Sequence, residues 1–159
     1  MEHLWTPWRF KYITSTDRPE GCVFCVLPEQ KEDASNLIVH RARFCFVILN
    51  LFPYNTGHLM IVPFKHEAVL SSLDDETTNE MMTLAKRCQR AMNEEYKPDG
   101  YNVGFNLGKC AGAGIAEHVH LHVVPRWIGD SNFMAVLGET RLLPEELSVT
   151  YARLKKHFS

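Results

Sequence analysis

Residues 117–127 read EHVHLHVVPRW, and the interpretation of the whole chain starts from this stretch. Three histidines, His118, His120 and His122, stand at alternate positions in it. The residues between and after them are aliphatic: Val119, Leu121 and Val123. Side chains of a strand alternate between two faces, so the imidazoles share one face at about 7 Å spacing. The aliphatic residues share the opposite face, which can pack on a core.

A strand face that carries only imidazoles has three interpretations. A solvated surface is the simplest, but such faces usually carry Lys, Glu, Thr or Ser, and the chain has eight histidines in 159 residues. Imidazole is also a common zinc ligand, and a strand can supply ligands from alternate positions. Neutral imidazole is a competent nucleophile and acid–base group near pH 7. The residues favour the two chemical interpretations without choosing between them.

The segment before the histidines is rich in glycine. Residues 106–114 read NLGKCAGAG, with Gly108, Gly112 and Gly114. Glycines let backbone N–H groups turn toward an anion and form a concave nest. Phosphoryl or nucleotidyl transfer needs such donors, together with a nucleophile for phosphorus and a proton source for the leaving group. A glycine-rich loop alone can equally be a turn. Its value as evidence for a phosphate site comes from its position, because it ends four residues before His118.

The remaining chain alternates strand-like and helix-like patterns. Runs of β-branched and aromatic residues predict strands at 43–50, 58–63, 101–107 and 118–125. Apolar residues at helical spacing predict a main helix over 74–96. Pro144 is predicted to open a final helix, with Glu145 and Glu146 in its first turn. This order of elements indicates an α+β domain built on an antiparallel sheet.

Size and composition restrict the class of protein. A chain of 159 residues suits one domain, which we divide into an N-terminal arm (1–36), a central part with sheet, main helix and triad (37–127), and a C-terminal extension (128–159). A net charge of −2 gives no electrostatic footprint for a nucleic acid polymer or an anionic membrane. No run approaches the ~18 apolar residues of a membrane span. Five cysteines and the lack of a signal-like N-terminus predict a cytoplasmic protein.

The triad, preceded by the glycine-rich loop that begins at Asn106, resembles the signature of the histidine triad family of nucleotide hydrolases and transferases. The similarity extends to NLFPYNTGHLMIVPFKH at 50–66, which resembles the family's hairpin. CVFC at 22–25 is similar to the N-terminal CxxC of many bacterial members. Three further stretches look closest to the branch that contains bacterial diadenosine tetraphosphate phosphorylases: LWTPWR at 4–9, GAGIAEH at 112–118 and PRWIGDSNF at 125–133.

This resemblance implies a five-stranded antiparallel sheet with two helices, and a homodimer whose sheets join edge to edge into ten strands. It implies cleavage of a nucleoside 5′-phosphate bond through a nucleotidyl-histidine intermediate, with a dinucleoside polyphosphate or another adenine nucleotide as substrate. Of the three catalytic histidines that it implies, His120 would be the nucleophile, His122 would contact the α-phosphate or the bridging oxygen, and His118 would complete the triad. The residues expected to bind substrate are Asn50 at the ribose, His58 beside the nucleophile, and Asn106, Gly112, Ala113 and Gly114 at the phosphate.

Residue chemistry supports the nucleophile without the resemblance. Nε2 of an imidazole can attack phosphorus only if Nδ1 carries the proton and an acceptor holds it. A neighbouring backbone carbonyl is the natural acceptor, so no carboxylate partner is needed. One position departs from the family: many members carry Gln or Ser where this chain has Gly114. A side-chain donor to the leaving group is therefore missing.

The CVFC motif raises the question of zinc. Its spacing suits zinc, but the chain has no second CxxC, and a lone cysteine pair is often just small buried residues. The resemblance supplies a full set of ligands: Cys22, Cys25, His66 and His118. Such a closed site leaves no open position, so the zinc would be structural, and no organic cofactor is expected.

Three rival functions remain open. A metallohydrolase would hold catalytic zinc on the triad itself. A purine nucleoside phosphoramidase would use the same histidines on a different leaving group. A non-catalytic nucleotide-binding protein would bind adenosine monophosphate without turnover, and Gly114 favours this last alternative.

Overall fold

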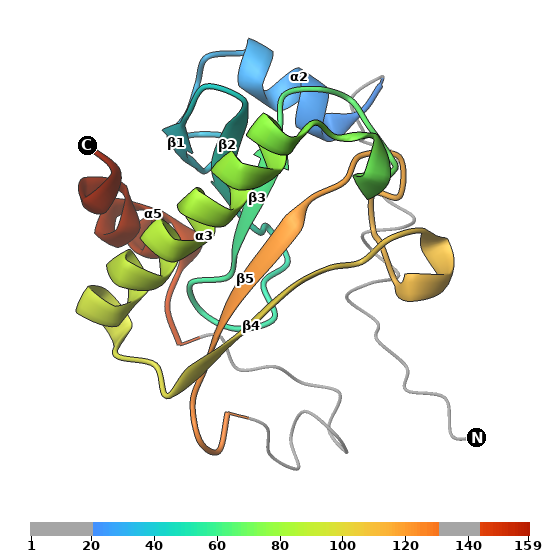
Figure 1. Cartoon of the computed structure of the whole chain (residues 1–159). Coiled ribbons are helices and arrows are strands. Elements are labelled where there is room, and N and C mark those ends of the chain that lie inside the picture. Colours follow the sequence, from blue (N-terminus) through green and yellow to red (C-terminus); the bar gives the residue numbers. More distant parts are fainter. Residues whose placement is uncertain (1–20, 131–143) are drawn as a thin grey trace.

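The structure is a computed structural model that describes residues 21–130 and 144–159. Its centre is a five-stranded antiparallel sheet in the order β1-β2-β3-β5-β4 (Figure 1). The strands are β1 (Ile38–Arg41), β2 (Cys45–Leu49), β3 (Leu59–Pro63), β4 (Gly100–Phe105) and β5 (Leu121–Arg126). The expected α+β fold with a five-stranded antiparallel sheet is confirmed.

The described residues contain three α-helices, where two were expected. They are α2 (Val23–Glu29), α3 (Asp75–Tyr96) and α5 (Leu147–Lys155). The additional helix is α2, in the 1–36 arm whose sequence shows no clear period. It has only seven residues and contains Pro28, so it is too short to display a helical repeat. None of the helices in the described residues could cross a membrane.

The main helix α3 matches the expected range. The side chain of Asp74 accepts a hydrogen bond from the backbone N–H of Thr77 at 2.7 Å and caps the first turn. The helix lies across one face of the sheet (Figure 1). Its buried residues are Thr77, Met81, Leu84, Ala85, Cys88, Ala91 and Met92. The apolar stripe in the sequence is therefore the face that packs on the sheet.

The two faces of the sheet carry two apolar clusters, and the sheet itself separates them. Val119, Leu121 and Val123 belong to the cluster under α3. The second cluster lies on the other face, where α2 packs: Phe24, Ile38, Phe46, Ile48, Met60 and Val62. The expected alternation is thus confirmed, because the aliphatic residues enter the α3 core while the histidines face the α2 side.

The strand that carries the histidines begins later than the predicted 118–125. Regular pairing of β5 with β3 starts at Ile61 opposite Leu121, so His118 and His120 precede the strand. The neighbouring strand ends at Pro63, which has no backbone N–H to continue the ladder. The carbonyl of Pro63 instead accepts a hydrogen bond from His118 Nε2 at 2.8 Å.

The final helix also begins later than expected. Helix α5 starts at Leu147, and Glu146 is its N-cap residue rather than part of its first turn. Glu145 accepts hydrogen bonds from the hydroxyls of Tyr96 at 2.6 Å and Thr150 at 2.8 Å. These contacts hold the start of α5 against the end of α3.

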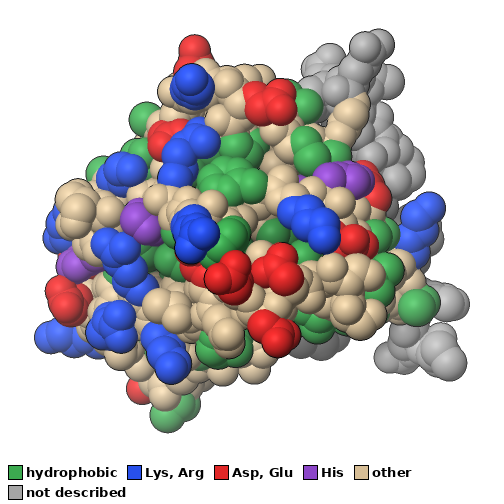
Figure 2. Space-filling view, turned by 45° about the horizontal axis from the view of Figure 1, so that its top comes forward, with side chains coloured by type: hydrophobic (Ala, Val, Ile, Leu, Met, Phe, Trp, Pro, Cys, Tyr) green, Lys and Arg blue, Asp and Glu red, His purple; other side chains and the backbone are tan. Residues whose placement is uncertain are grey.

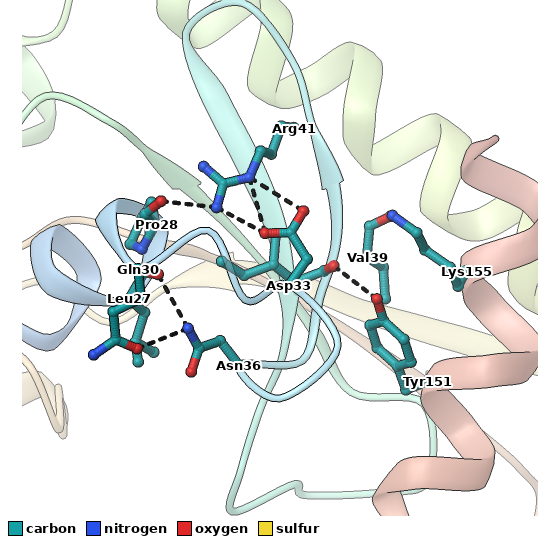
Figure 3. A network of polar contacts seen from close by, with 10 residues as sticks. Leu27, Pro28, Gln30, Asp33, Asn36, Val39, Arg41, Tyr151 and Lys155 are labelled. Carbon is teal, nitrogen blue, oxygen red and sulfur yellow. Dashed lines mark hydrogen bonds and ion pairs between the residues drawn. The ribbon is translucent and has the colours of Figure 1, made fainter.

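Helix α5 covers the edge strand β1. The hydroxyl of Tyr151 donates to the carbonyl of Ile38 at 3.3 Å, and Lys155 Nζ donates to the carbonyl of Val39 at 3.0 Å (Figure 3). Backbone groups of an edge strand otherwise offer a template for another chain. The β1 edge of the sheet is therefore occupied within the molecule.

Polar side chains hold the C-terminal end of α2 on the sheet (Figure 3). Arg41 on β1 donates to the carbonyl of Pro28 at 2.8 Å and to the carboxylate of Asp33 at 2.7 Å. The side-chain amide of Asn36 donates to the carbonyl of Leu27 at 3.1 Å. Basic and acidic side chains are mixed over the surface seen in Figure 2. That mixture agrees with the small net charge.

Candidate functional site

A pocket of about 540 Å³ lies on the α2 side of the sheet. Its apolar lining comes mainly from α2, β2 and the loop after β2, and includes Val23, Phe24, Leu27, Ile48 and Phe52. Its polar lining includes Asn50, Asn106, His120 and His122. A concave, mostly apolar pocket with a few polar groups is the usual form of a small-molecule site.

The three triad histidines are buried. Their exposed fractions are 0% for His118, 5% for His120 and 7% for His122. Burial disfavours the charged ring and lowers the pKa of all three below the usual value. For His122, burial and then the neighbouring His120 lower the pKa to about 4. We therefore treat the three rings as neutral near pH 7.

The hydrogen bond of His120 fixes its tautomer. Nδ1 of His120 lies 2.8 Å from the carbonyl oxygen of His118. A carbonyl can only accept, so Nδ1 carries the proton and Nε2 keeps its lone pair. The side chain lines the pocket. The structure thus supplies the backbone acceptor that residue chemistry requires of a nucleophilic histidine.

A second chain of hydrogen bonds fixes the tautomers of His58 and His122. The backbone N–H of Tyr54 donates to His58 Nδ1 at 3.1 Å, and the side-chain amide of Asn50 lies 3.4 Å from the same atom. His58 Nε2 therefore carries the proton and donates to His122 Nδ1 at 2.9 Å. The proton of His122 is consequently on Nε2; the Asn106 atom 3.5 Å away is Nδ2, which is also a donor, so no hydrogen bond joins these two nitrogens. His58 was expected beside the nucleophile, and its direct partner is His122.

The glycine-rich loop contributes glycines to the pocket. Gly108 and Gly112 have φ angles of 81° and 84°, which side chains other than glycine rarely adopt. Gly112 and Gly114 line the pocket, whereas Ala113 is not among its lining residues. The N–H of Ala113 donates to the carbonyl of Gly108 at 3.3 Å within the loop. The structure thus brings Gly112 and Gly114, but not Ala113, to the pocket that the histidines line.

The PRWIGD part of the motif at 125–133 positions the loop before His58. The carboxylate of Asp130 accepts from Arg126 Nε at 2.6 Å, from the Trp127 backbone N–H at 3.1 Å and from Asn55 Nδ2 at 2.7 Å. The carbonyl of Asn55 accepts from the backbone N–H of His58 at 3.1 Å. Two segments far apart in the sequence are therefore joined beside the site. Residues 131–133 and the 4–9 motif lie outside the described residues.

Four side chains gather as a candidate metal centre beside the pocket: Cys22, Cys25, His66 and His118. Their ligand atoms all lie within 4.8 Å of one another. Cys22 Sγ is 3.3 Å from His118 Nδ1, and Cys25 Sγ is 3.3 Å from His66 Nδ1. Tetrahedral zinc would separate sulfur and nitrogen ligands by about 3.6 Å. The donor set fits zinc.

The orientation of His118 also suits a metal. Its Nε2 donates to the carbonyl of Pro63, which leaves the lone pair of Nδ1 directed at the cysteine sulfurs. Of the three triad histidines, only His118 belongs to the four-residue cluster. Catalytic zinc held by the whole triad therefore finds no support in the geometry of the described residues.

Sequence reasoning missed the apolar lining of the pocket and the ring of Tyr54. That ring lies 4.5 Å from the His58 ring and 5.8 Å from the His122 ring, measured between centroids. Val23 and Phe24 stand inside the CVFC motif, so the motif itself was the available signal. From the sequence, only the two cysteines of the motif receive an interpretation, as sulfur ligands or as small buried residues, and the two residues between them receive none.

Comparisons with known proteins show a family match over the central part of the chain. A family model described as HIT domain matches residues 30–127. The AP-4-A phosphorylase of Mycobacterium tuberculosis is 37% identical over 158 residues, covering 94% of this chain and 80% of that protein. An adenosine 5′-monophosphoramidase of Saccharomyces cerevisiae is 34% identical over 106 residues, covering 67% of this chain and 63% of that protein.

A solved structure adds an observation on metal. The crystal structure of a Zn-bound histidine triad family protein from Mycobacterium smegmatis superimposes with a TM-score of 0.71 at 28% identity, covering 87% of this chain and 93% of that one. A similar protein thus binds zinc, which agrees with the donor set found here.

The metal centre makes a direct prediction. Protein purified without added metal should contain about one zinc per chain, because four ligands close a tetrahedral site. Replacing one ligand in Cys22→Ser should remove most of that zinc, as measured by inductively coupled plasma mass spectrometry. Cys110→Ser is the matched control, because Cys110 is exposed on the glycine-rich loop and is not one of the four ligands. The Cys110→Ser protein should therefore keep its zinc. Substoichiometric zinc that Cys22→Ser leaves unchanged would refute the site.

Burial of His122 predicts a measurable titration. Proton NMR should place its pKa near 4 in the folded chain, with the signal identified by its loss in His122→Gln. In the unfolded chain the ring takes up a proton near the usual ~6.5, so folding opposes protonation. The His122 contribution to the free energy of unfolding should therefore decrease as the pH falls from about 6.5 toward 4. A folded-state pKa near 6.5 would contradict the buried, neutral ring.

Proposed function

The chain belongs to the histidine triad family and is an enzyme that acts on nucleotides, and we propose that it cleaves dinucleoside polyphosphates through a nucleotide carried on His120. One observation carries the proposal. The hydrogen bond from His120 Nδ1 to the carbonyl of His118 leaves an unprotonated Nε2 on a side chain that lines the pocket. An imidazole in this state can attack phosphorus without a separate base.

The pocket lining supports a nucleoside as the bound group. Phe24, Leu27 and Ile48 give an apolar surface on which a flat base can pack, and the pocket volume suits a nucleoside. We assign the ribose hydroxyls to Asn50, whose Oδ1 already accepts from the Phe52 backbone N–H at 2.9 Å. That bond holds the Asn50 side chain in one orientation.

We assign the phosphates to the glycine side of the pocket. Gly112, Gly114 and Asn106 line the pocket together with His120 and His122. Backbone N–H groups of a glycine-rich turn are suited to phosphate oxygens. Because Gly114 offers no side chain to the leaving group, that task falls to His122 and to backbone groups.

The first chemical step follows from the two tautomers. His120 Nε2 attacks the α-phosphorus, so a P–N bond forms and the P–O bond to the departing phosphate chain breaks. His122 carries its single proton on Nε2 and can donate a hydrogen bond to the departing oxygen, which leaves as a phosphate anion and needs no proton. The carbonyl of His118 then holds the Nδ1 proton of a positively charged, nucleotide-bearing ring.

The second step returns the enzyme to its starting state. An acceptor oxygen attacks the same phosphorus, any proton on that oxygen passes to solvent, the P–N bond breaks and His120 regains its lone pair. Water as acceptor yields a nucleoside monophosphate, and inorganic phosphate yields a nucleoside diphosphate. The similarity to an AP-4-A phosphorylase favours phosphate as the acceptor.

Zinc, when bound, would supply structural support rather than a reacting group. Cys22, Cys25, His66 and His118 would hold it, and no ligand position would remain open. His118 would then be fixed at Nδ1 as well as at Nε2. The residue whose carbonyl orients the nucleophile would thus have little freedom to move.

A phosphoramidase activity is the second candidate, supported by the similarity to an adenosine 5′-monophosphoramidase. It would use the same attack by His120 on an α-phosphorus with a nitrogen leaving group. A panel of dinucleoside polyphosphates and an adenosine phosphoramidate, each assayed with and without inorganic phosphate, separates the two candidates by which substrate has the higher kcat/KM.

The nucleophile assignment predicts the behaviour of two variants. His120→Ala should lower kcat by at least ~1000-fold, because the ring forms the bond to phosphorus. Wild-type protein quenched during turnover of labelled substrate should carry nucleotide, and His120→Ala should carry none. His157→Ala is the control, since His157 pairs with Glu95 at 2.7 Å and does not line the pocket. Near-wild-type turnover by His120→Ala would overturn the mechanism, and nucleotide binding without turnover by wild type would favour the non-catalytic alternative.

We also propose that the enzyme is a homodimer in which two β4 strands meet and extend the sheet to ten strands. The opposite edge, β1, is covered by α5, whereas Asn102, Val103 and Gly104 in the middle of β4 are exposed. An exposed edge strand can pair with a second copy of itself.

The dimer proposal predicts a charge effect at that edge. Val103→Glu should weaken self-association by sedimentation equilibrium, because like charges would meet across the two-fold axis. Val149→Glu is matched in exposure, since both valines are 43% exposed, and it should leave association unchanged. A monomeric wild-type protein, or equal effects of the two variants, would count against the β4 interface.

A further inference from the structure

Helix α2 carries the sulfur ligands of the candidate metal centre and part of the pocket lining. Cys22 is its N-cap residue and Cys25 lies in its first turn. Val23, Phe24 and Leu27 come from the same helix and line the pocket. The two cysteines therefore flank pocket residues within one helical turn. Movement of that turn would displace the sulfur atoms and the pocket lining together.

Phe24 connects the two regions directly. Its side chain is 3% exposed and packs in the apolar cluster on the α2 side of the sheet. The centroid of its ring is 5.6 Å from that of His118 and 5.0 Å from that of His120. One ring thus contacts a candidate metal ligand and the proposed nucleophile while lining the pocket.

The two ends of α2 are held by different means. Arg41 and Asn36 bind carbonyls at the C-terminal end, at Pro28 and Leu27. Over residues 21–130 and 144–159, the polar contacts from the first turn to the rest of the fold are the sulfur–imidazole contacts of its cysteines. A metal would convert these contacts into bonds. A bound metal would therefore add a constraint on the position of the first turn, and with it Phe24, beyond the apolar packing of that ring.

We propose that zinc and nucleotide bind cooperatively through the first turn of α2. Zinc fixes Cys22 and Cys25, and thereby the Val23–Phe24 lining against which a nucleoside packs. By reciprocity, a nucleotide on that lining raises the affinity for zinc by the same factor. The inference rests on the proposed nucleotide site. His66 is exposed and both cysteines are half-buried, so exchange of the metal with solvent is physically accessible.

Zinc competition on the full chain tests this coupling. The zinc affinity of zinc-loaded protein is measured against a chromogenic chelator, with and without saturating adenosine monophosphate. We expect the nucleotide to tighten zinc binding roughly tenfold. Calorimetry should find adenosine monophosphate bound more weakly, by the same factor, to metal-stripped protein. Circular dichroism should show that the stripped protein is still folded, because the coupling acts through one turn.

Two matched variants test whether the coupling between zinc and nucleotide passes through α2. Phe24→Leu and Phe52→Leu each replace an aromatic ring that lines the pocket with a smaller aliphatic side chain, but only Phe24 is on α2. Phe52→Leu should keep the coupling factor, and Phe24→Leu should reduce it toward one. If circular dichroism shows Phe24→Leu to be unfolded, Val23→Ala on the same turn takes its place with the same expectation.

Each alternative outcome has a distinct meaning. Unchanged zinc affinity in protein that calorimetry shows to bind nucleotide overturns the coupling and leaves the proposed function intact. Equal coupling in the α2 variant and wild type, or a stripped protein that is unfolded, contradicts transmission through α2. Failure of zinc-loaded protein to bind adenosine monophosphate removes the proposed nucleotide site, and this inference falls with it.

Discussion

The hydrogen bond from His120 Nδ1 to the carbonyl of His118 is the interaction on which the site depends. Both groups are buried, and leaving such an N–H without a partner would cost about 1–3 kcal/mol. A penalty of that size favours the Nδ1–H tautomer by roughly 5-fold to 160-fold. The ring therefore presents its lone pair on Nε2. No carboxylate is required, because a backbone group two residues earlier performs the orientation.

His118 connects this interaction to the rest of the fold. Its Nε2 donates to Pro63 at the end of β3, its Nδ1 faces the cysteines next to and on α2, and its carbonyl holds the nucleophile. The aliphatic residue that follows it, Val119, is buried under α3 on the other face. One residue therefore relates the sheet, the candidate metal centre and the proposed reacting ring.

The sequence predicted the features that rest on local pattern. Alternation over His118–Val123 placed imidazoles and aliphatic residues on opposite faces, and helical spacing over 74–96 located α3. Helix α2 and strand β1 were not found, because seven and four residues are too few to show a period. The start of α5 was misplaced because Glu145 bonds Tyr96 and Thr150 instead of entering the helix.

The site residues likewise divide into those that local sequence pattern predicted and those that it did not. His120 and its backbone acceptor followed from chemistry within three residues. The bond between His58 and His122 joins positions 64 residues apart, and the cysteines meet His118 from more than 90 residues away. Such contacts depend on the order of the strands in the sheet, and local sequence pattern gives little information about that order. For the metal ligands, the family resemblance supplied what local pattern could not.

The stereochemical course at phosphorus is the most direct test of the central claim that His120 forms a bond to the α-phosphorus. A substrate with a phosphorothioate of one configuration at that position, turned over with an oxygen-labelled acceptor, gives a product of defined handedness. Each in-line displacement inverts the configuration. Attack by His120 followed by attack of the acceptor therefore predicts net retention. Net inversion would mean a single direct displacement and would contradict the account.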